Sequence, residues 1–187
     1  MITDKKGSVK EKILLTAHDL FYAKGFRATG IDKIIREAQV TKVSFYRHFP
    51  AKNTLILAYL HYRHDLWITW FHDTLARKIG EENILPAALS GTLNEWLRCP
   101  SFRGCAFINA TAEADSEDIA EEIKELCRNH KLDAQKTITL LTGITDKTVM
   151  SQLMMLIDGA IIHAQMGMDV TEVIEQLNVG LEKLLAD

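Results

Sequence analysis

Helix-breaking residues are scarce in this chain. Only three prolines and ten glycines interrupt its 187 residues, and the alternation of apolar and polar residues that marks a strand is rare. Hydrophobic residues make up 47% of the chain, which is enough for a substantial core. This composition predicts an all-α fold and argues against a sheet.

Cysteine and long apolar runs are also rare. Cys99, Cys105 and Cys127 are odd in number and show no CxxC spacing, so neither a disulfide framework nor a zinc finger is indicated. The longest purely apolar run, Leu153 to Ile157, is far shorter than the ~20 residues of a membrane span. The charged N-terminus lacks the apolar segment of an export signal. We therefore expect a soluble, cytoplasmic protein without a membrane partner.

Positive charge is concentrated near the N-terminus. Residues 1–50 hold ten lysines and arginines against five aspartates and glutamates, a net charge of +5, although the whole chain carries −3. Residues 51–187 hold twelve against twenty, a net charge of −8. A basic end on an acidic body is typical of a protein that binds a polyanion at one end only.

Two short amphipathic segments lie on either side of a tight turn at Gln39 to Thr41. Each is too short to be stable alone, so we expect both to pack on a third helix, which follows Ser8 and stops at Gly25. Thr41 is expected to cap the second segment. The apolar residues that recur at helical spacing are Ile31, Ile34, Ile35, Ala38, Phe45 and Phe49.

The outer face of the second segment carries cations, hydroxyl groups and a tyrosine. Such groups suit phosphates and base edges in a major groove, so we predict a helix-turn-helix with its recognition helix at about Lys42 to Phe49. Base contacts are expected from Lys42, Val43 and Ser44, and Arg47 suits bases or phosphates. A solvated surface is the alternative for each, and partial burial is a further one for His48. The expected phosphate contacts are Thr29, Tyr46, His48 and Lys52.

The rest of the chain is expected to form further helices. A long helix without a breaker should run from Ala51 to about Ile79, continuous with the basic segment after Pro50. Residues 104–114 are expected to be a short, weakly polar segment. The later helices should begin at Asn83, Ser116, Asp146 and Asp169.

Three motifs follow one another in a fixed register. They are Thr-Gly-Ile-Asp-Lys-Ile from Thr29, Val-Thr-Lys from Val40, and Phe-Tyr-Arg-His-Phe-Pro-Ala-Lys from Phe45. Together they resemble the N-terminal domain of the TetR family of transcriptional regulators over about residues 10–60. The family usually has glycine where this chain has Gln39, and often again at Val43. Gln39 therefore either accepts a positive φ, at a cost of roughly 1 kcal/mol, or lies in a looser turn.

The resemblance implies further properties. The tyrosine and lysine positions that match Tyr46 and Lys52 commonly contact the DNA backbone in the family. Members generally dimerise through their last two helices and bind a small effector in the body. The apolar helices after Asp146 and Asp169 agree with such a homodimer, and Gly159 would permit close approach. An ordinary core within one chain is the alternative.

Aromatic, methionine and histidine residues of the body are candidates for the effector site. They could line an apolar cavity with a few polar contacts, although the same set at helical spacing is typical of a plain core. The segment from Arg103 to Asn109 resembles a stretch found in some members of the TetR family. The candidate ligand-binding residues are His64, Trp67, Trp70, Phe71, Trp96, Phe102, Cys105, Phe107, Asn109, Met154, Met155 and His163.

Two smaller groups of residues allow more than one interpretation. Cys105 follows a glycine and lies near Arg103, surroundings that could favour a thiolate and hence sensing of oxidants or electrophiles; a small buried apolar residue is the alternative. His61 and His64 lie three residues apart beside Asp65, a spacing that could share a metal. Without a second cluster, two solvated histidines explain the pattern equally well, so we expect no metal.

The complete prediction has two domains. Residues 1–50 form a helix-turn-helix DNA-binding domain, and residues 51–187 form a larger helical domain for effector binding and dimerisation. The function is a ligand-responsive, sequence-specific repressor that a small molecule of unknown identity releases from palindromic operator DNA. The alternatives are a thiol-based regulator acting through Cys105 and a helical adaptor that does not bind DNA. An enzyme is not expected, because no Ser/His/Asp order or glycine-rich phosphate loop is present, and no cofactor is implied.

Overall fold

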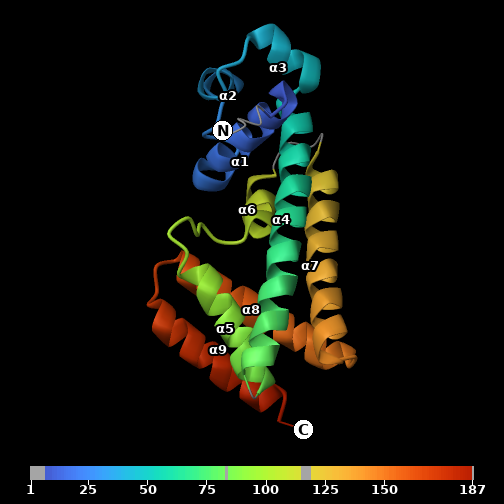
Figure 1. Cartoon of the computed structure of the whole chain (residues 1–187), viewed down its shortest axis with the longest axis vertical. Coiled ribbons are helices and arrows are strands. Elements are labelled where there is room, and N and C mark those ends of the chain that lie inside the picture. Colours follow the sequence, from blue (N-terminus) through green and yellow to red (C-terminus); the bar gives the residue numbers. More distant parts are fainter. Residues whose placement is uncertain (1–6, 83, 115–118, 187) are drawn as a thin grey trace, which may run out of the picture. The chain divides into compact units, whose positions relative to one another are not determined.

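The computed structural model describes residues 7–82, 84–114 and 119–186. Within these ranges the chain forms nine helices and no strand (Figure 1), which confirms the all-α prediction. The helices are α1 (Val9–Lys24), α2 (Ile31–Glu37), α3 (Lys42–His48), α4 (Lys52–Glu81), α5 (Leu85–Leu97), α6 (Ala106–Glu113), α7 (Ala120–Thr142), α8 (Lys147–Gln165) and α9 (Val170–Leu184).

The helices belong to two compact units. The first unit comprises residues 1–63 and 106–127, and the second comprises residues 64–105 and 128–187. The division falls inside α4 because the first half of this helix contributes its side chains to the first core: the Tyr59 ring lies 5.5 Å from Phe21 and 5.8 Å from Phe26. The functional division between residues 1–50 and 51–187 stays a prediction.

Local signals in the sequence set the ends of the helices in the first unit. Ser8 caps α1 by accepting a hydrogen bond from the Glu11 amide at 3.1 Å, and Gly25 ends α1 at a φ of 79°. Thr41 caps α3 through the Ser44 amide, also at 3.1 Å. These three predicted ends are confirmed, and α1 packs against both α2 and α3 as the helix-turn-helix requires.

Helix α6 departs from the expectation of a short, weakly polar segment at residues 104–114. Ala106, Phe107 and Ala110 are buried in it. Ala110 follows Phe107 by three residues and Ala106 by four, and these spacings place the three on one side of a helix. Gly104, at a φ of 86°, precedes the helix. Eight residues are too few for periodicity alone to reveal a helix, so tertiary packing decides its conformation.

The second unit is built largely from α5, α8 and α9, which pack against one another (Figure 1). Asp146 caps α8 by accepting hydrogen bonds from the Thr148 and Val149 amides at 2.7 and 2.9 Å. Asp169 caps α9 in the same way, so both predicted starts are confirmed. The predicted starts at Asn83 and Ser116 lie outside the described residues.

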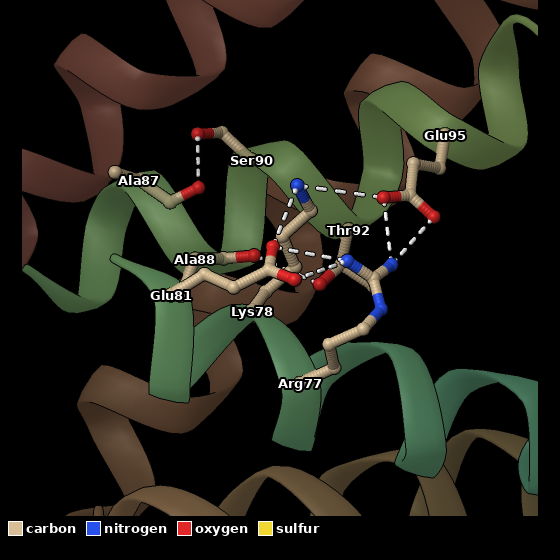
Figure 2. Close-up of polar contacts among 8 residues, drawn as sticks. All are labelled: Arg77, Lys78, Glu81, Ala87, Ala88, Ser90, Thr92 and Glu95. Carbon is tan, nitrogen blue, oxygen red and sulfur yellow. Dashed lines mark hydrogen bonds and ion pairs between the residues drawn. The ribbon is translucent and has the colours of Figure 1, made fainter.

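An ion-pair network joins α4 to α5 (Figure 2). The Arg77 guanidinium donates to both carboxylate oxygens of Glu81, each at 3.0 Å, and to those of Glu95 at 2.7 and 2.9 Å. Lys78 Nζ lies 3.4 Å from an oxygen of each carboxylate. Hydrogen bonds from Arg77 hold the pKa of Glu81 and of Glu95 below its usual value.

Candidate DNA-binding surface and effector cavity

The outer face of α3 is exposed and carries the predicted base-reading side chains. Lys42 and Arg47 are exposed, and Val43 and Tyr46 expose 70% and 40% of their surface. Phe45, on the opposite side, is fully buried. This arrangement offers two cations, a phenol hydroxyl and a bare isopropyl group to a partner, which are suitable contacts for phosphates, base edges and a thymine methyl group.

An ion pair between α2 and α3 restrains Lys42, one of these cations, only weakly. Lys42 Nζ lies 4.0 Å from Asp32 Oδ1, and both side chains are more than two-thirds exposed. Exposed pairs of this kind contribute about 0–1 kcal/mol and are screened by salt. Lys42 can therefore exchange Asp32 for a base edge or a phosphate at small cost.

The second unit encloses a narrow apolar cavity. Its aromatic wall contains Trp67 stacked on Phe71, with ring centroids 4.7 Å apart, and Trp96 edge-on to Trp67 at 5.3 Å. The enclosed space is about 10 Å³, close to the minimum for one water molecule. A ligand larger than one water molecule would therefore require the lining side chains to move.

Polar groups at this cavity come from α4 and α7. His130, which is 3% exposed, has its Nδ1 atom 3.2 Å from Nδ1 of His64, and His64 Nε2 lies 3.6 Å from Asp133. Lys131, a further lining residue, donates a hydrogen bond to Asp158. Among the described residues, the indole nitrogen of Trp67 is the buried side-chain polar atom that has no hydrogen-bond partner.

Three comparisons place this geometry among known proteins. The sequence profile of the family described as "Bacterial regulatory proteins, tetR family" matches residues 13–59. The crystal structure of a TetR-family transcriptional regulator from Streptomyces coelicolor is 33% identical and superposes with a TM-score of 0.77, covering 96% of this chain and 95% of that one. The chain belongs to the TetR family.

Curated relatives are matched over less of their length. The uncharacterized HTH-type transcriptional regulator YuxN of Bacillus subtilis is 39% identical over 32% of this chain, and the match spans only 21% of YuxN. The HTH-type transcriptional repressor NemR of Escherichia coli is 28% identical over 62% of this chain and 57% of NemR. The alignments with YuxN and NemR therefore span less than two-thirds of either relative.

The predicted phosphate contact of Thr29 needs correction in this TetR-family chain. Its side chain is fully buried, and its hydroxyl donates to the Leu20 carbonyl at 3.4 Å. A side chain with no exposed surface does not reach a phosphate in this conformation, so Thr29 packs the junction between α1 and α2. Gly30, the next residue, occupies the cap position of α2.

Lys52 also differs from a simple phosphate anchor. Its Nζ atom donates to the Phe26 carbonyl at 2.6 Å, in a partly buried position. Burial lowers the pKa of the Lys52 ammonium group, and the nearby Glu113 carboxylate raises it in part. Ser44 and His48 are half-buried beside the exposed residues of α3, and their DNA contacts, like those of the other predicted residues, stay predictions.

Only some of the predicted effector-site residues of this TetR-family chain line the cavity. Trp70 and Phe102 do not line it but pack around Trp96, at 6.3 and 5.4 Å between ring centroids. Phe107 and Asn109 lie on α6, in the first unit. The predicted residues that do line the cavity are Trp67, Phe71, Trp96, Cys105 and Met154.

Met155 and His163 lie elsewhere, in a groove between α8 and α9. The groove has a volume of about 370 Å³ and includes Leu156, Gly159 and Met168. Met155 exposes 70% of its surface, and Met168 exposes 48%. Neither residue lines the cavity, because their positions on α8 point them to the exposed face that α8 shares with α9. Their contacts with an effector stay predictions.

Sequence reasoning missed His130 and Lys131, the polar residues that α7 contributes to the cavity. A signal was present, because His130 follows Ile123 by seven residues and precedes Ala134 by four, so it continues the apolar stripe of α7. The suggested metal site does not form around His61 and His64: His64 contacts His130, and no group of three or more His, Cys, Asp or Glu side chains in the described ranges is arranged to hold a metal.

None of the described helices combines the length and the apolar character that crossing a bilayer requires.

Proposed function

We propose that this TetR-family chain is a ligand-responsive, sequence-specific transcriptional repressor that acts as a homodimer on palindromic operator DNA. The observation that carries this proposal is the outer face of α3, where Lys42, Val43, Tyr46 and Arg47 are all exposed. In a helix-turn-helix dimer, two such helices enter successive major grooves about 34 Å apart. The basic charge of residues 1–50 would add attraction to the phosphates.

The dimer is proposed to form through α8 and α9. Their shared face exposes the apolar side chains of Met155, Leu156 and Met168 around the groove, and a patch of this kind is typical of a protein–protein interface. A second copy of the same face would cover it with two-fold symmetry, giving a bundle of four helices.

The effector is proposed to bind in the cavity of the second unit. The walls are aromatic and aliphatic, and the buried indole N–H of Trp67 supplies a hydrogen-bond donor, so a flat apolar molecule with an acceptor atom suits the cavity. Because the cavity is nearly filled, binding requires the walls to separate. Such a ligand would shift the protein between conformations by at most its differential affinity, typically ~1–3 kcal/mol of coupling.

A thiol-based response through Cys105 is the second candidate. Cys105 lines the same cavity and is 3% exposed, so a reagent would first have to enter the effector site. Arg103, the cation that the sequence suggested could favour a Cys105 thiolate, donates hydrogen bonds to the Pro100 and Phe102 carbonyls. Release of DNA by an electrophile from the wild type but not from Cys105→Ser would favour this candidate over reversible binding.

The test of the main proposal is binding of the purified chain to duplexes selected from a random pool. We expect saturable binding whose log affinity falls linearly with log salt, by about 0.9 for each phosphate contact. A protein-docking adaptor would retain none of the duplexes at low salt. That result would refute DNA binding by α3.

A further inference from the structure

The loop between α1 and α2 is held by two side chains from other helices of the first unit. The Glu113 carboxylate, at the end of α6, accepts hydrogen bonds from the backbone amides of Phe26 at 2.6 Å and Arg27 at 3.2 Å. Lys52, the first residue of α4, donates to the Phe26 carbonyl at 2.6 Å. Both polar backbone groups of Phe26 are therefore bonded to side chains that lie far away in sequence.

Gly25 makes this contact possible. Its φ of 79° is in the region that side chains disfavour, and a Cβ atom placed there would lie 2.6 Å from a Glu113 carboxylate oxygen. The turn at Gly25 lets two successive amides, those of Phe26 and Arg27, point at one anion, as in a backbone nest. Hydrogen bonds to a charged acceptor are about twice as strong as neutral ones.

The loop sets where the helix-turn-helix begins. Phe26 is 7% exposed and packs edge-on against Phe21 at 5.2 Å. Thr29, buried three residues later, bonds to Leu20, and α2 starts at Ile31. A loop that is fixed at Phe26 and Thr29 fixes the entry of α2, and α2 packs directly on α3.

We propose that Glu113 is a positioning residue for DNA binding: its carboxylate holds the α1–α2 loop so that α2 and α3 are presented for the operator. The inference rests on the DNA binding proposed above. It assigns Glu113 no contact with DNA, so its loss should weaken binding without removing a phosphate contact.

The experiment compares four proteins on one duplex selected with the wild type. The variants are Glu113→Ala, Glu113→Gln and the control Glu122→Ala, which removes an exposed carboxylate of the same unit. We expect Glu113→Ala to lose about fivefold to tenfold in affinity, the lower range of coupling between sites, with the wild-type salt slope. Glu113→Gln should lose less, because its amide oxygen can still accept one hydrogen bond, and the control should stay within twofold.

Amide hydrogen exchange supplies a second readout that a loss of global stability would not imitate. In Glu113→Ala the Phe26 and Arg27 amides should exchange faster, while the Ile34 and Phe45 amides keep wild-type protection. If Glu113→Ala does not fold, the same comparison is made with Glu113→Gln, whose side chain has nearly the same shape.

Two results would overturn the proposal. One is a Glu113→Ala affinity within twofold of the wild type or equal to that of Glu122→Ala. The other is unchanged exchange at Phe26 and Arg27. Failure of the wild type itself to bind any duplex would instead refute the proposed function, so the two failures are distinguishable.

Discussion

Gln39 shows how a single residue reports on the turn of the helix-turn-helix. It has a φ of 54°, the only positive φ of a non-glycine residue among those described. Of the two options that the sequence left open, a strained turn or a looser one, the strained turn is confirmed. The turn stays tight, with the Val40 amide bonded to the Ile35 carbonyl at 3.2 Å, so the backbone of α2 and α3 imposes this conformation.

Replacement of Gln39 by glycine should therefore stabilise the helix-turn-helix. The left-handed conformation costs a residue with a side chain roughly 1–2 kcal/mol, and the extra freedom of glycine in the unfolded chain returns about 0.5–1 kcal/mol of that. We expect Gln39→Gly to raise the free energy of unfolding by about 0.5–1 kcal/mol in urea denaturation. Gln39→Ala, which keeps a Cβ atom, should show no gain, and a destabilised Gln39→Gly would contradict the argument.

At the scale of elements, charged side chains help to hold the junction of α4 and α5. Arg77 bonds to Glu81 within its own helix and to Glu95 across the junction (Figure 2). The folded state holds the pKa of both carboxylates below the ordinary value of 4.5. The network therefore contributes stability above that value, and the contribution is lost as the pH falls through the lower folded pKa.

The corresponding prediction concerns Arg77→Gln. Because the pairs are exposed, we expect its Tm to be only about 1–3 °C below that of the wild type at pH 7 and low salt. The difference should shrink as the pH falls below 4.5 or as salt rises. A scan of Tm against pH for both proteins measures it, and a difference that persists at pH 3 in high salt would mean that packing, not charge, explains the effect.

The elements also show what the sequence could and could not predict. Capping residues such as Ser8, Thr41 and Asp146 have a local signal, so the helix starts that they mark could be predicted. Helix α6 and the burial of Thr29 could not, because both depend on packing between elements: Glu113 at the end of α6 bonds to Phe26, and Thr29 bonds to Leu20 on α1. In the cavity, the aromatic residues of α4 and α5 could be named from their apolar character, whereas the inward face of α7, with His130, was not predicted.

For the whole molecule, the proposed function depends on pairing two helix-turn-helix domains at a fixed spacing. The exposed apolar face of α8 and α9 is the proposed place of pairing, and Met155 is its most exposed large apolar residue at 70%. Two linked helix-turn-helix domains bind a palindrome far more tightly than one such domain, since binding of the second domain is intramolecular once the first is bound.

Met155→Glu should therefore produce a monomer, because each copy would have to bury an unpaired carboxylate in the proposed interface. We expect light scattering to give half the wild-type mass and operator affinity to fall by about 100-fold or more. Leu140→Glu is the matched control, since Leu140 on α7 is 76% exposed and lies outside the groove. If Met155→Glu remains dimeric while Leu140→Glu dissociates, the interface has been assigned to the wrong helices.

The most direct measurement of the central claim, that the outer face of α3 reads duplex DNA, is a titration of wild type, Lys42→Ala and Tyr46→Ala on the selected duplex and on its single-base variants. The wild type should discriminate against a wrong base by about 1–3 kcal/mol at the position that Lys42 contacts, and Lys42→Ala should lose that discrimination. Tyr46→Ala should weaken binding to all duplexes alike. A wild type without saturable binding at low salt, or a Lys42→Ala variant that keeps both affinity and base preference, would contradict the claim.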